Sequence, residues 1–145
     1  MEQTNKELLL KDLCARLPYG VKVESVFINP DTKEHKSRGI EVFDATDILM
    51  IRDGFGEFKP YLFPLSSMTE EQLHELKDII VFRYNRNTLE LVEWTETHKT
   101  LEFWLEEVPQ YEVVEVFDWL NKNHFDYRGL IPLGIALDAT GKGIY

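Results

Sequence analysis

The sequence contains one cysteine, Cys14, and four histidines in 145 residues. A single cysteine can form neither a disulfide within the chain nor a thiolate metal site, which is typical of proteins from a reducing compartment. The histidines, at positions 35, 74, 98 and 124, show no recognisable ligand spacing. We therefore expect a cytoplasmic protein that holds no metal and no other cofactor.

Long apolar runs are also missing. The run "IIVF" at 79–82 is far shorter than the roughly 20 residues that cross a bilayer. The N-terminal stretch "MEQTNKELLLKD" carries charges of both signs around three leucines, too few for the core of a secretion signal. We expect neither membrane association nor a secretion signal.

Basic residues are scarce, with 16 against 26 acidic ones, which gives a formal net charge of −10. Such a chain repels free nucleic acid and anionic membrane surfaces through its average field. We therefore expect no direct binding of nucleic acid. They favour a protein partner, in particular one with a basic surface.

Hydrophobic residues make up 43% of the chain and aromatic residues 12%, enough for one core, so we expect a single domain over residues 1–145. Near the N-terminus, helical spacing predicts an amphipathic helix over 4–17 that is ended by Pro18. Its predicted apolar stripe consists of Leu10, Leu13, Cys14 and Leu17. Cys14 should therefore be buried and inert.

Short β-rich runs divided by turn-forming segments follow from Val21 to Phe63. They predict an antiparallel meander with four strands, at 21–28, 39–43, 47–52 and 57–63. Pro60 and Pro64 lack a backbone N–H, so the last run is expected at an edge of the sheet or as an exit from it.

The segment "SMTEEQLHELKDII" begins with a capping box, in which Thr69 and Gln72 satisfy each other's backbone N–H groups. It predicts a helix over about 70–84. His74 and Glu75 resemble part of a zinc-protease motif, but the second histidine is missing, so a solvated polar face is the favoured interpretation.

Two further strands, "TLELVEWT" and "TLEFWLEE" at 88–95 and 100–107, predict a hairpin, and a helix is expected over 110–123. The predicted fold is therefore α+β, an antiparallel β-meander plus a hairpin packed against about three helices.

Acidic charge is concentrated between Thr88 and Asp118, where nine carboxylates face Lys99 alone, a local charge of −8. Two interpretations stay open. The zone docks a basic partner or mimics nucleic acid, or its carboxylates merely line a solvated surface, which is the commoner outcome for a charge run. The candidate binding residues are Glu102, Glu106, Glu107, Glu112 and Glu115.

The stretch "HFDYRGLIPLG", residues 124–134, places His124, Asp126 and Arg128 at alternate positions before an apolar segment. In an extended stretch these three side chains point to one side and could form a proton-transfer site. If Asp126 instead caps a helical turn that begins at Tyr127, then Asp126, Tyr127 and Arg128 form a structural clasp.

The clasp is favoured because the apolar segment that follows must be buried, and because a histidine with one aspartate lacks a nucleophile or a metal. This interpretation places Leu133 in the core. It also expects Asp126→Asn to leave stability nearly unchanged, while Asp126→Ala costs on the order of 1 kcal/mol.

The blocks "DWLNKNHFDYRGLIPLGIALDA" at 118–139 and "KPYLFPLSSMTEEQ" at 59–72 cover about a quarter of the chain. They resemble a group of small uncharacterised proteins encoded by phages and mobile elements of gut bacteria. Phe63 stands where a basic residue is commoner in that group. The resemblance implies a mobile-element origin and action in the cytoplasm, and it transfers no catalytic residue.

Three functional hypotheses follow. The leading one is a non-enzymatic protein that binds or regulates a host or phage protein. The second is a small hydrolase or nuclease centred on His124 and Asp126, with Arg128 beside them. The third is an acidic inhibitor that occupies a basic, nucleic-acid-binding surface of another protein.

Overall fold

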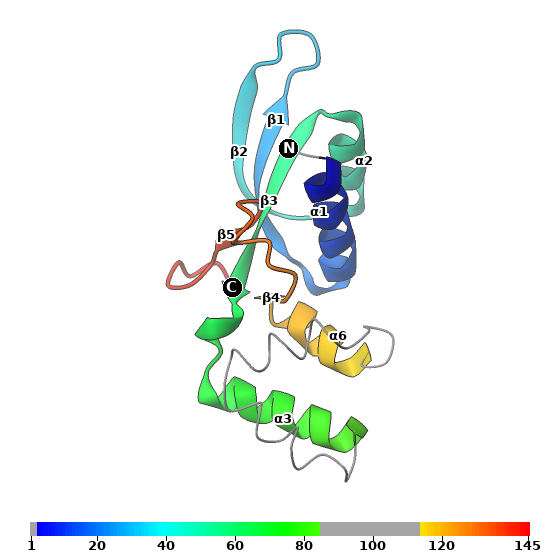
Figure 1. Cartoon of the computed structure of the whole chain (residues 1–145). Coiled ribbons are helices and arrows are strands. Elements are labelled where there is room, and N and C mark those ends of the chain that lie inside the picture. The colour runs from blue at the N-terminus through cyan, green and yellow to red at the C-terminus, as the bar shows by residue number, and fades with distance from the viewer. Residues whose placement is uncertain (1–2, 85–113) are drawn as a thin grey trace. The chain divides into compact units, whose positions relative to one another are not determined.

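The computed structural model describes residues 3–84 and 114–145, which belong to two compact units (Figure 1). Unit 1 combines the chain up to Leu62 with Arg128–Tyr145, and unit 2 is Phe63–Tyr127. The fold is α+β, as predicted, with four α-helices and five strands among the described residues. That residues 1–145 form a single domain stays a prediction.

In unit 1, β1 (Lys22–Ile28) and β2 (His35–Val42) form an antiparallel hairpin. The Asn29 side chain holds their turn, because its Oδ1 accepts hydrogen bonds from the backbone N–H groups two and three residues later. β2 begins inside the segment that we expected to be a turn, so the predicted start of this strand at residue 39 is wrong.

A bulge interrupts β2 at its free edge. Ser25 pairs with Gly39 and Val26 pairs with Ser37, so Arg38 is the extra residue. Gly39 has a φ of 75°, a conformation that residues with a side chain rarely adopt. A bulge twists an edge strand, and together with the charged Arg38 it makes β2 a poor template for another strand.

β3 (Gly56–Pro64) pairs antiparallel with β1 from Gly56 to Pro60, which gives the strand order β2-β1-β3 in this unit. The strands therefore do not follow one another in sequence order, and the meander is wrong in this detail. Tyr61 and Leu62 then pair in parallel with β5 (Leu137–Asp138).

The last of these strands is predicted to lie at an edge of the sheet or to exit from it, and the pairing agrees with the second alternative. Residues 56–60 pair with β1, whereas 61–62 pair with β5 and 63–64 with β4. Pro60 lies at this change of partner. It is the last residue that pairs with β1, and the pairing with β5 begins one residue later. Its missing N–H therefore falls where one ladder ends and the next begins.

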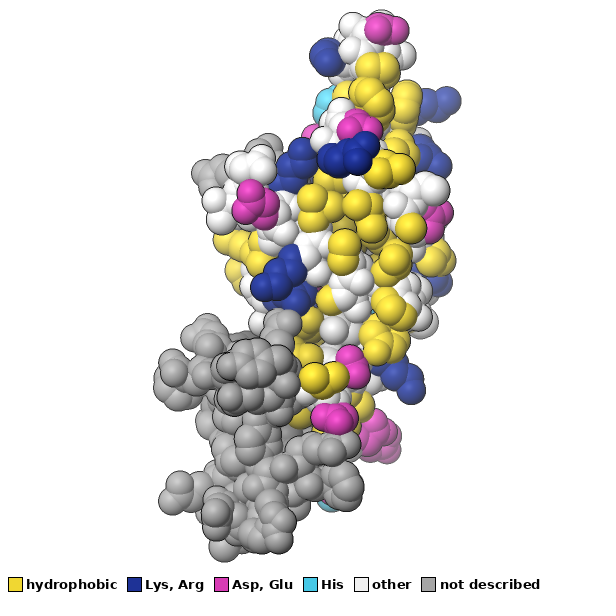
Figure 2. Space-filling model, turned by 90° about the vertical axis from the view of Figure 1, so that its right-hand side faces the viewer, with side chains coloured by type: hydrophobic (Ala, Val, Ile, Leu, Met, Phe, Trp, Pro, Cys, Tyr) yellow, Lys and Arg dark blue, Asp and Glu magenta, His cyan; other side chains and the backbone are white. Residues whose placement is uncertain are grey.

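Two helices, α1 (Gln3–Arg16) and α2 (Ala45–Asp53), lie on the same side of this sheet (Figure 1). Figure 2 looks onto this side of unit 1, where hydrophobic and charged side chains share the surface. The core of unit 1 lies between these two helices and the sheet. Burial of one large apolar side chain in such a core stabilises the fold by about 1.5–3 kcal/mol. Its buried residues are Leu9, Leu13, Val21, Val23, Phe43, Ile51, Phe58, Leu62, Leu130, Ile135 and Ala136.

α2 replaces the strand predicted at 47–52. The reason is a capping box that involves two aspartates: Asp44 Oδ1 accepts hydrogen bonds from the N–H groups of Thr46 and Asp47, and Asp47 Oδ2 accepts one from the N–H of Asp44. Gly54 ends the helix with a φ of 78°. The sequence pattern predicts a turn at 44–46, but Asp at a helix start has the same hydrogen-bonding capacity as Ser or Thr.

The helix predicted over 4–17 is confirmed as α1, but its buried face is shifted by one residue. The buried positions are Leu9, Asp12, Leu13 and Arg16, which follow the same helical spacing. Cys14 is exposed, so the prediction that it lies in the core is wrong. The polar pair formed by Asp12 and Arg16 occupies the place that we had given to apolar residues.

Unit 2 contains α3 (Glu70–Tyr84), which the capping box predicted: the N–H of Gln72 donates to Thr69 Oγ1, and the N–H of Thr69 donates to Gln72 Oε1. His74 and Glu75 are exposed, as expected for a solvated polar face. The predicted hairpin at 88–107 lies outside the described residues.

α6 (Val114–Lys122) confirms the described part of the helix predicted over 110–123. A short strand, β4 (Phe125–Asp126), follows and pairs in parallel with Phe63 and Pro64 at the end of β3. The buried core of this unit comprises Leu65, Met68, Leu76, Val116, Phe117, Leu120 and Phe125.

The apolar segment after Gly129 is buried in unit 1 only in part. Leu130, Ile135 and Ala136 belong to the core, whereas Leu133 is 49% exposed. Leu133 lies in a run of turns rather than in a helix or strand. The side chains of such a segment do not alternate regularly between core and solvent. The expectation that Leu133 helps to fill the core is wrong.

Tyr145 fastens the end of the β1–β3 ladder. Its hydroxyl accepts a hydrogen bond from the N–H of Lys22 at 2.9 Å and donates one to the carbonyl oxygen of Tyr61 at 2.8 Å. Val23 and Pro60 form the last pair of this ladder; Lys22 directly precedes Val23, and Tyr61 directly follows Pro60. The phenol thus bridges two strands where they separate, and burial raises its pKa to about 12.

We expect Tyr145→Phe to lower the free energy of unfolding by about 1–2 kcal/mol, because two backbone groups lose their partner. Since the pKa of Tyr145 is raised from 10.0 to about 12, its contribution is complete below about pH 10 and is lost as the pH rises to about 12. Denaturant titrations at several pH values measure this loss of stability.

Tyr19→Phe is the matched control, because the hydroxyl of Tyr19 makes no hydrogen bond within the described residues. Equal effects of the two substitutions would contradict the bridge.

Candidate functional site

Arg128, the last charged residue of the 124–134 stretch, belongs to a buried ionic cluster in unit 1. Its Nη1 lies 3.0 Å from Asp12 Oδ1, and Arg16 Nε lies 2.8 Å from Asp12 Oδ2. The side chains of Asp12 and Arg16 are 0% exposed, and that of Arg128 is 8% exposed. One carboxylate therefore holds two guanidinium groups and joins α1 to a segment 116 residues away.

The other residues of the predicted clasp lie in unit 2. Asp126 is buried within β4, where it pairs with Pro64, and no helix begins at Tyr127. The expectation that Asp126 is a helix cap is therefore wrong, because the chain is extended at this position. Tyr127 packs its ring on Phe117, with centroids 5.0 Å apart, and donates a hydrogen bond from its hydroxyl to Asn121 Oδ1.

His124 adopts a left-handed conformation, with a φ of 63°, between α6 and β4. Its backbone N–H donates to the carbonyl of Asn121, and its own carbonyl accepts from the N–H of Phe63 at 2.8 Å. A non-glycine residue with positive φ turns the chain sharply here. The backbone of His124 thus directs β4 towards the end of β3.

The alternative catalytic group of His124, Asp126 and Arg128 is divided between the units, with the first two in unit 2 and Arg128 in unit 1. Within residues 3–84 and 114–145, no group of three or more His, Cys, Asp or Glu side chains could hold a metal ion. The contacts of Arg128 with Asp12 are those of a structural ion pair.

Carboxylates at the start of α2 also serve the fold. The hydroxyl of Thr46, bonded to Asp44, lowers the pKa of that carboxyl. Burial raises the pKa of Asp47, and the nearby charges of Asp44 and Glu41 add to this rise. These groups are engaged in the capping box, so the cluster is explained by the helix start.

An acidic face lies on the two described helices of unit 2. It consists of Glu71, Glu75 and Asp78 of α3 together with Glu115 and Asp118 of α6, and all five side chains are exposed. The three residues of α3 follow the spacing of one helical side. Among the exposed side chains described in this unit, Lys122 is the one basic residue.

Trp119 joins the two halves of the acidic face. Its indole Nε1 donates a hydrogen bond to Glu75 Oε2 at 3.1 Å, so α3 and α6 meet at this point. Glu115 lies one turn before Trp119 on α6, and therefore on the same side. The indole stacks on Phe125, with ring centroids 5.7 Å apart and planes at 13°. A fixed, partly exposed aromatic ring thus lies beside the carboxylate of Glu75, with Glu115 on the same side of α6.

Of the five candidate binding residues, Glu115 is exposed on α6, and Glu102, Glu106, Glu107 and Glu112 lie outside the described residues. The sequence of unit 2, Phe63–Tyr127, carries five basic and fourteen acidic residues, a net charge of −9. The rest of the chain carries eleven basic and twelve acidic residues, a net charge of −1. The charge excess of the protein is thus concentrated in unit 2.

Comparisons with protein-family models, with curated proteins and with solved structures gave no match to this chain. In the part of the chain that the structure describes, no helix has the length and hydropathy needed to cross a membrane.

Sequence reasoning missed the buried cluster around Asp12, although one signal was present. Asp12 and Arg16 stand four residues apart, the spacing at which a helix brings opposite charges together. Their burial carries no local signal, because it depends on the chain near Arg128. The α3 part of the acidic face was interpreted only as solvated surface, since its relation to Trp119 requires tertiary contact.

We expect Asp12→Ala to lower the free energy of unfolding by about 3–5 kcal/mol, because two buried guanidinium groups lose their counter-ion. Asp53→Ala is the control. It also removes a carboxylate bonded to an arginine, Arg52, but this pair is exposed and its loss should barely change stability. Chemical denaturation of both variants gives the comparison. A small effect of Asp12→Ala would mean that the cluster does not hold α1 in place.

Proposed function

We propose that the chain is a non-enzymatic binding protein of a phage or mobile element, and that it docks a protein with a basic surface through the acidic face. The observation that carries this proposal is the charge distribution: a net −9 in unit 2 against −1 in the rest of the chain. A uniform acidic composition would serve solubility alone. Because the negative charge is concentrated in unit 2, this unit attracts a cation-rich surface more strongly than the rest of the chain does.

The geometry around Trp119 supports recognition beyond general attraction. Carboxylates that share one helical side repel one another by a few tenths of a kcal/mol per pair, a cost that a basic partner would offset. The indole offers a flat surface beside Glu75, and Glu115 lies one turn away on the same side of α6. An arginine side chain can stack on such a ring while its guanidinium pairs with a neighbouring carboxylate.

The same chemistry covers an inhibitor that occupies the nucleic-acid-binding surface of another protein, since such surfaces are basic. Direct binding of nucleic acid or of an anionic membrane is disfavoured by the field of unit 2. The hydrolase hypothesis receives no support from a described cluster of side chains, because Arg128 is engaged by Asp12.

The triple variant Glu71→Gln, Glu115→Gln, Asp118→Asn tests the acidic face. Immobilised protein is used to capture partners from a lysate of the bacterial host, and mass spectrometry identifies what is retained. We expect the triple variant to lose the main partner of the parent protein, because three charges leave the docking surface while Glu75 and its bond to Trp119 remain.

The matched control is the triple variant Glu7→Gln, Asp31→Asn, Glu34→Gln, which removes the same charge from exposed positions of unit 1. It should retain the partner. Equal loss in both triple variants would indicate net charge rather than a docking face, and full retention in both would contradict the proposal.

A further inference from the structure

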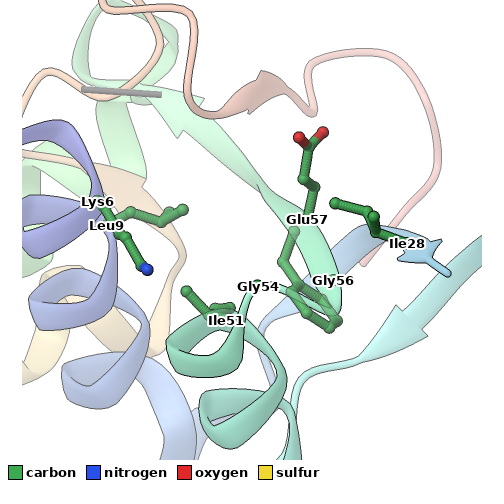
Figure 3. A pocket seen from close by; sticks show the side chains of 8 residues that line it. Lys6, Leu9, Ile28, Ile51, Gly54, Gly56 and Glu57 are labelled. Atoms are coloured by element: carbon green, nitrogen blue, oxygen red, sulfur yellow. The ribbon is translucent and has the colours of Figure 1, made fainter. Parts of the chain in front are cut away.

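Unit 1 contains a pocket of about 240 Å³ between the first half of α1, the end of α2 and the adjoining ends of β1 and β3 (Figure 3). Leu9, Ile28, Ile51 and Phe58 form its apolar wall. Lys6 contributes its one inward-directed charge, since the ammonium extends towards the gap between the helices, whereas the carboxylate of Glu57 points away from the other lining side chains (Figure 3).

Two glycines line this pocket, so no side chain projects from these positions. A Cβ at Gly54 would meet nothing within 4 Å, whereas one at Gly56 would come within 2.8 Å of the Phe58 ring, so Gly56 lets that ring pack against the backbone. Phe55 stands between the two glycines, is 40% exposed and does not line the pocket.

The polar groups at the pocket favour an anion. Lys6 makes no hydrogen bond or ion pair with any residue that the structure describes. Asp53 lies within electrostatic range of Lys6 but is bonded to Arg52 at 3.0 Å. The first turn of α1, where Lys6 lies, has no acidic residue, so the positive end of the helix dipole adds to the charge of the ammonium.

The backbone N–H groups beside the pocket are already used. Those of Gly54 and Phe55 donate to carbonyls of α2, and that of Ile28 donates to Phe55. A ligand would therefore find one cationic group and an apolar wall, with no array of donors for a sugar or a phosphate. The volume corresponds to roughly eight water-sized units at about 30 Å³ each, so the ligand must be small.

We propose that this pocket binds a small monocarboxylate with an apolar body of about the size of hexanoate. Its carboxylate pairs with the ammonium of Lys6, and its hydrocarbon part contacts Leu9, Ile51 and Phe58. The site lies in unit 1 and uses none of the acidic face, so it stands or falls independently of the docking function.

Titration of ¹⁵N-labelled full-length protein with hexanoate, followed by NMR, tests the proposal. Hexanoate should shift the amide resonances of Gly54 and Gly56 at millimolar concentration, and hexylamine should not. Lys6→Met should weaken hexanoate binding by about two- to fivefold, the effect of losing a partly exposed ion pair. Lys11→Met, which removes an exposed lysine of the same helix outside the pocket, is the matched control and should bind as the parent does.

Equal shifts with hexanoate and hexylamine, or no shift of the pocket resonances with hexanoate, would overturn the proposal. So would equal affinities of the Lys6→Met and Lys11→Met proteins. If Lys6→Met does not fold, the comparison of hexanoate with hexylamine on the parent protein decides. As a second variant, Ile28→Trp should abolish binding by filling the pocket, and full binding by this variant would contradict the assigned location.

Discussion

The buried carboxylate of Asp12 is the constraint on which unit 1 depends. It accepts contacts from Arg16 on its own helix and from Arg128, which follows the whole of unit 2 in the sequence. Removing such charges from water is costly, so the cluster is stable only while every member is in place. The chain must therefore return from unit 2 at one defined point, and the core residues after Arg128 are positioned with it.

Unit 2 is arranged on a different principle. Its apolar residues form a core of their own, while its exposed helical surface is acidic and carries one ordered tryptophan. Stability and charge are thus divided between the units. Unit 1 contains the buried ion pairs, and unit 2 carries nearly all of the excess charge, which suits a division between a framework and a docking surface.

The sequence predicted most where the signals are local. The capping box at Thr69 and Gln72 gave α3, and helical spacing gave α1 and α6. α2 was missed because its box uses aspartate at both positions, which we had interpreted as a turn before a strand. A short continuous apolar run, such as 48–51, cannot by itself distinguish a strand from a helix.

Other features could not be derived from local pattern. The buried side of α1 differs by one residue from the predicted one, because Asp12 is neutralised by Arg128, 116 residues later. The place of Leu133 depends on turns that expose it. The acidic face was foreseen in part through Glu115, but its centre at Trp119 follows from a contact with Glu75, a residue of another helix 44 positions earlier in the sequence.

The most direct test of the docking function is the salt dependence of the affinity for the captured partner. Screening shortens from about 10 Å at 0.1 M salt to about 3 Å at 1 M. If the acidic face makes the contact, the dissociation constant should rise at least about tenfold over this range, the loss expected when several charge pairs are screened together. A dissociation constant that stays the same across the range would contradict the account.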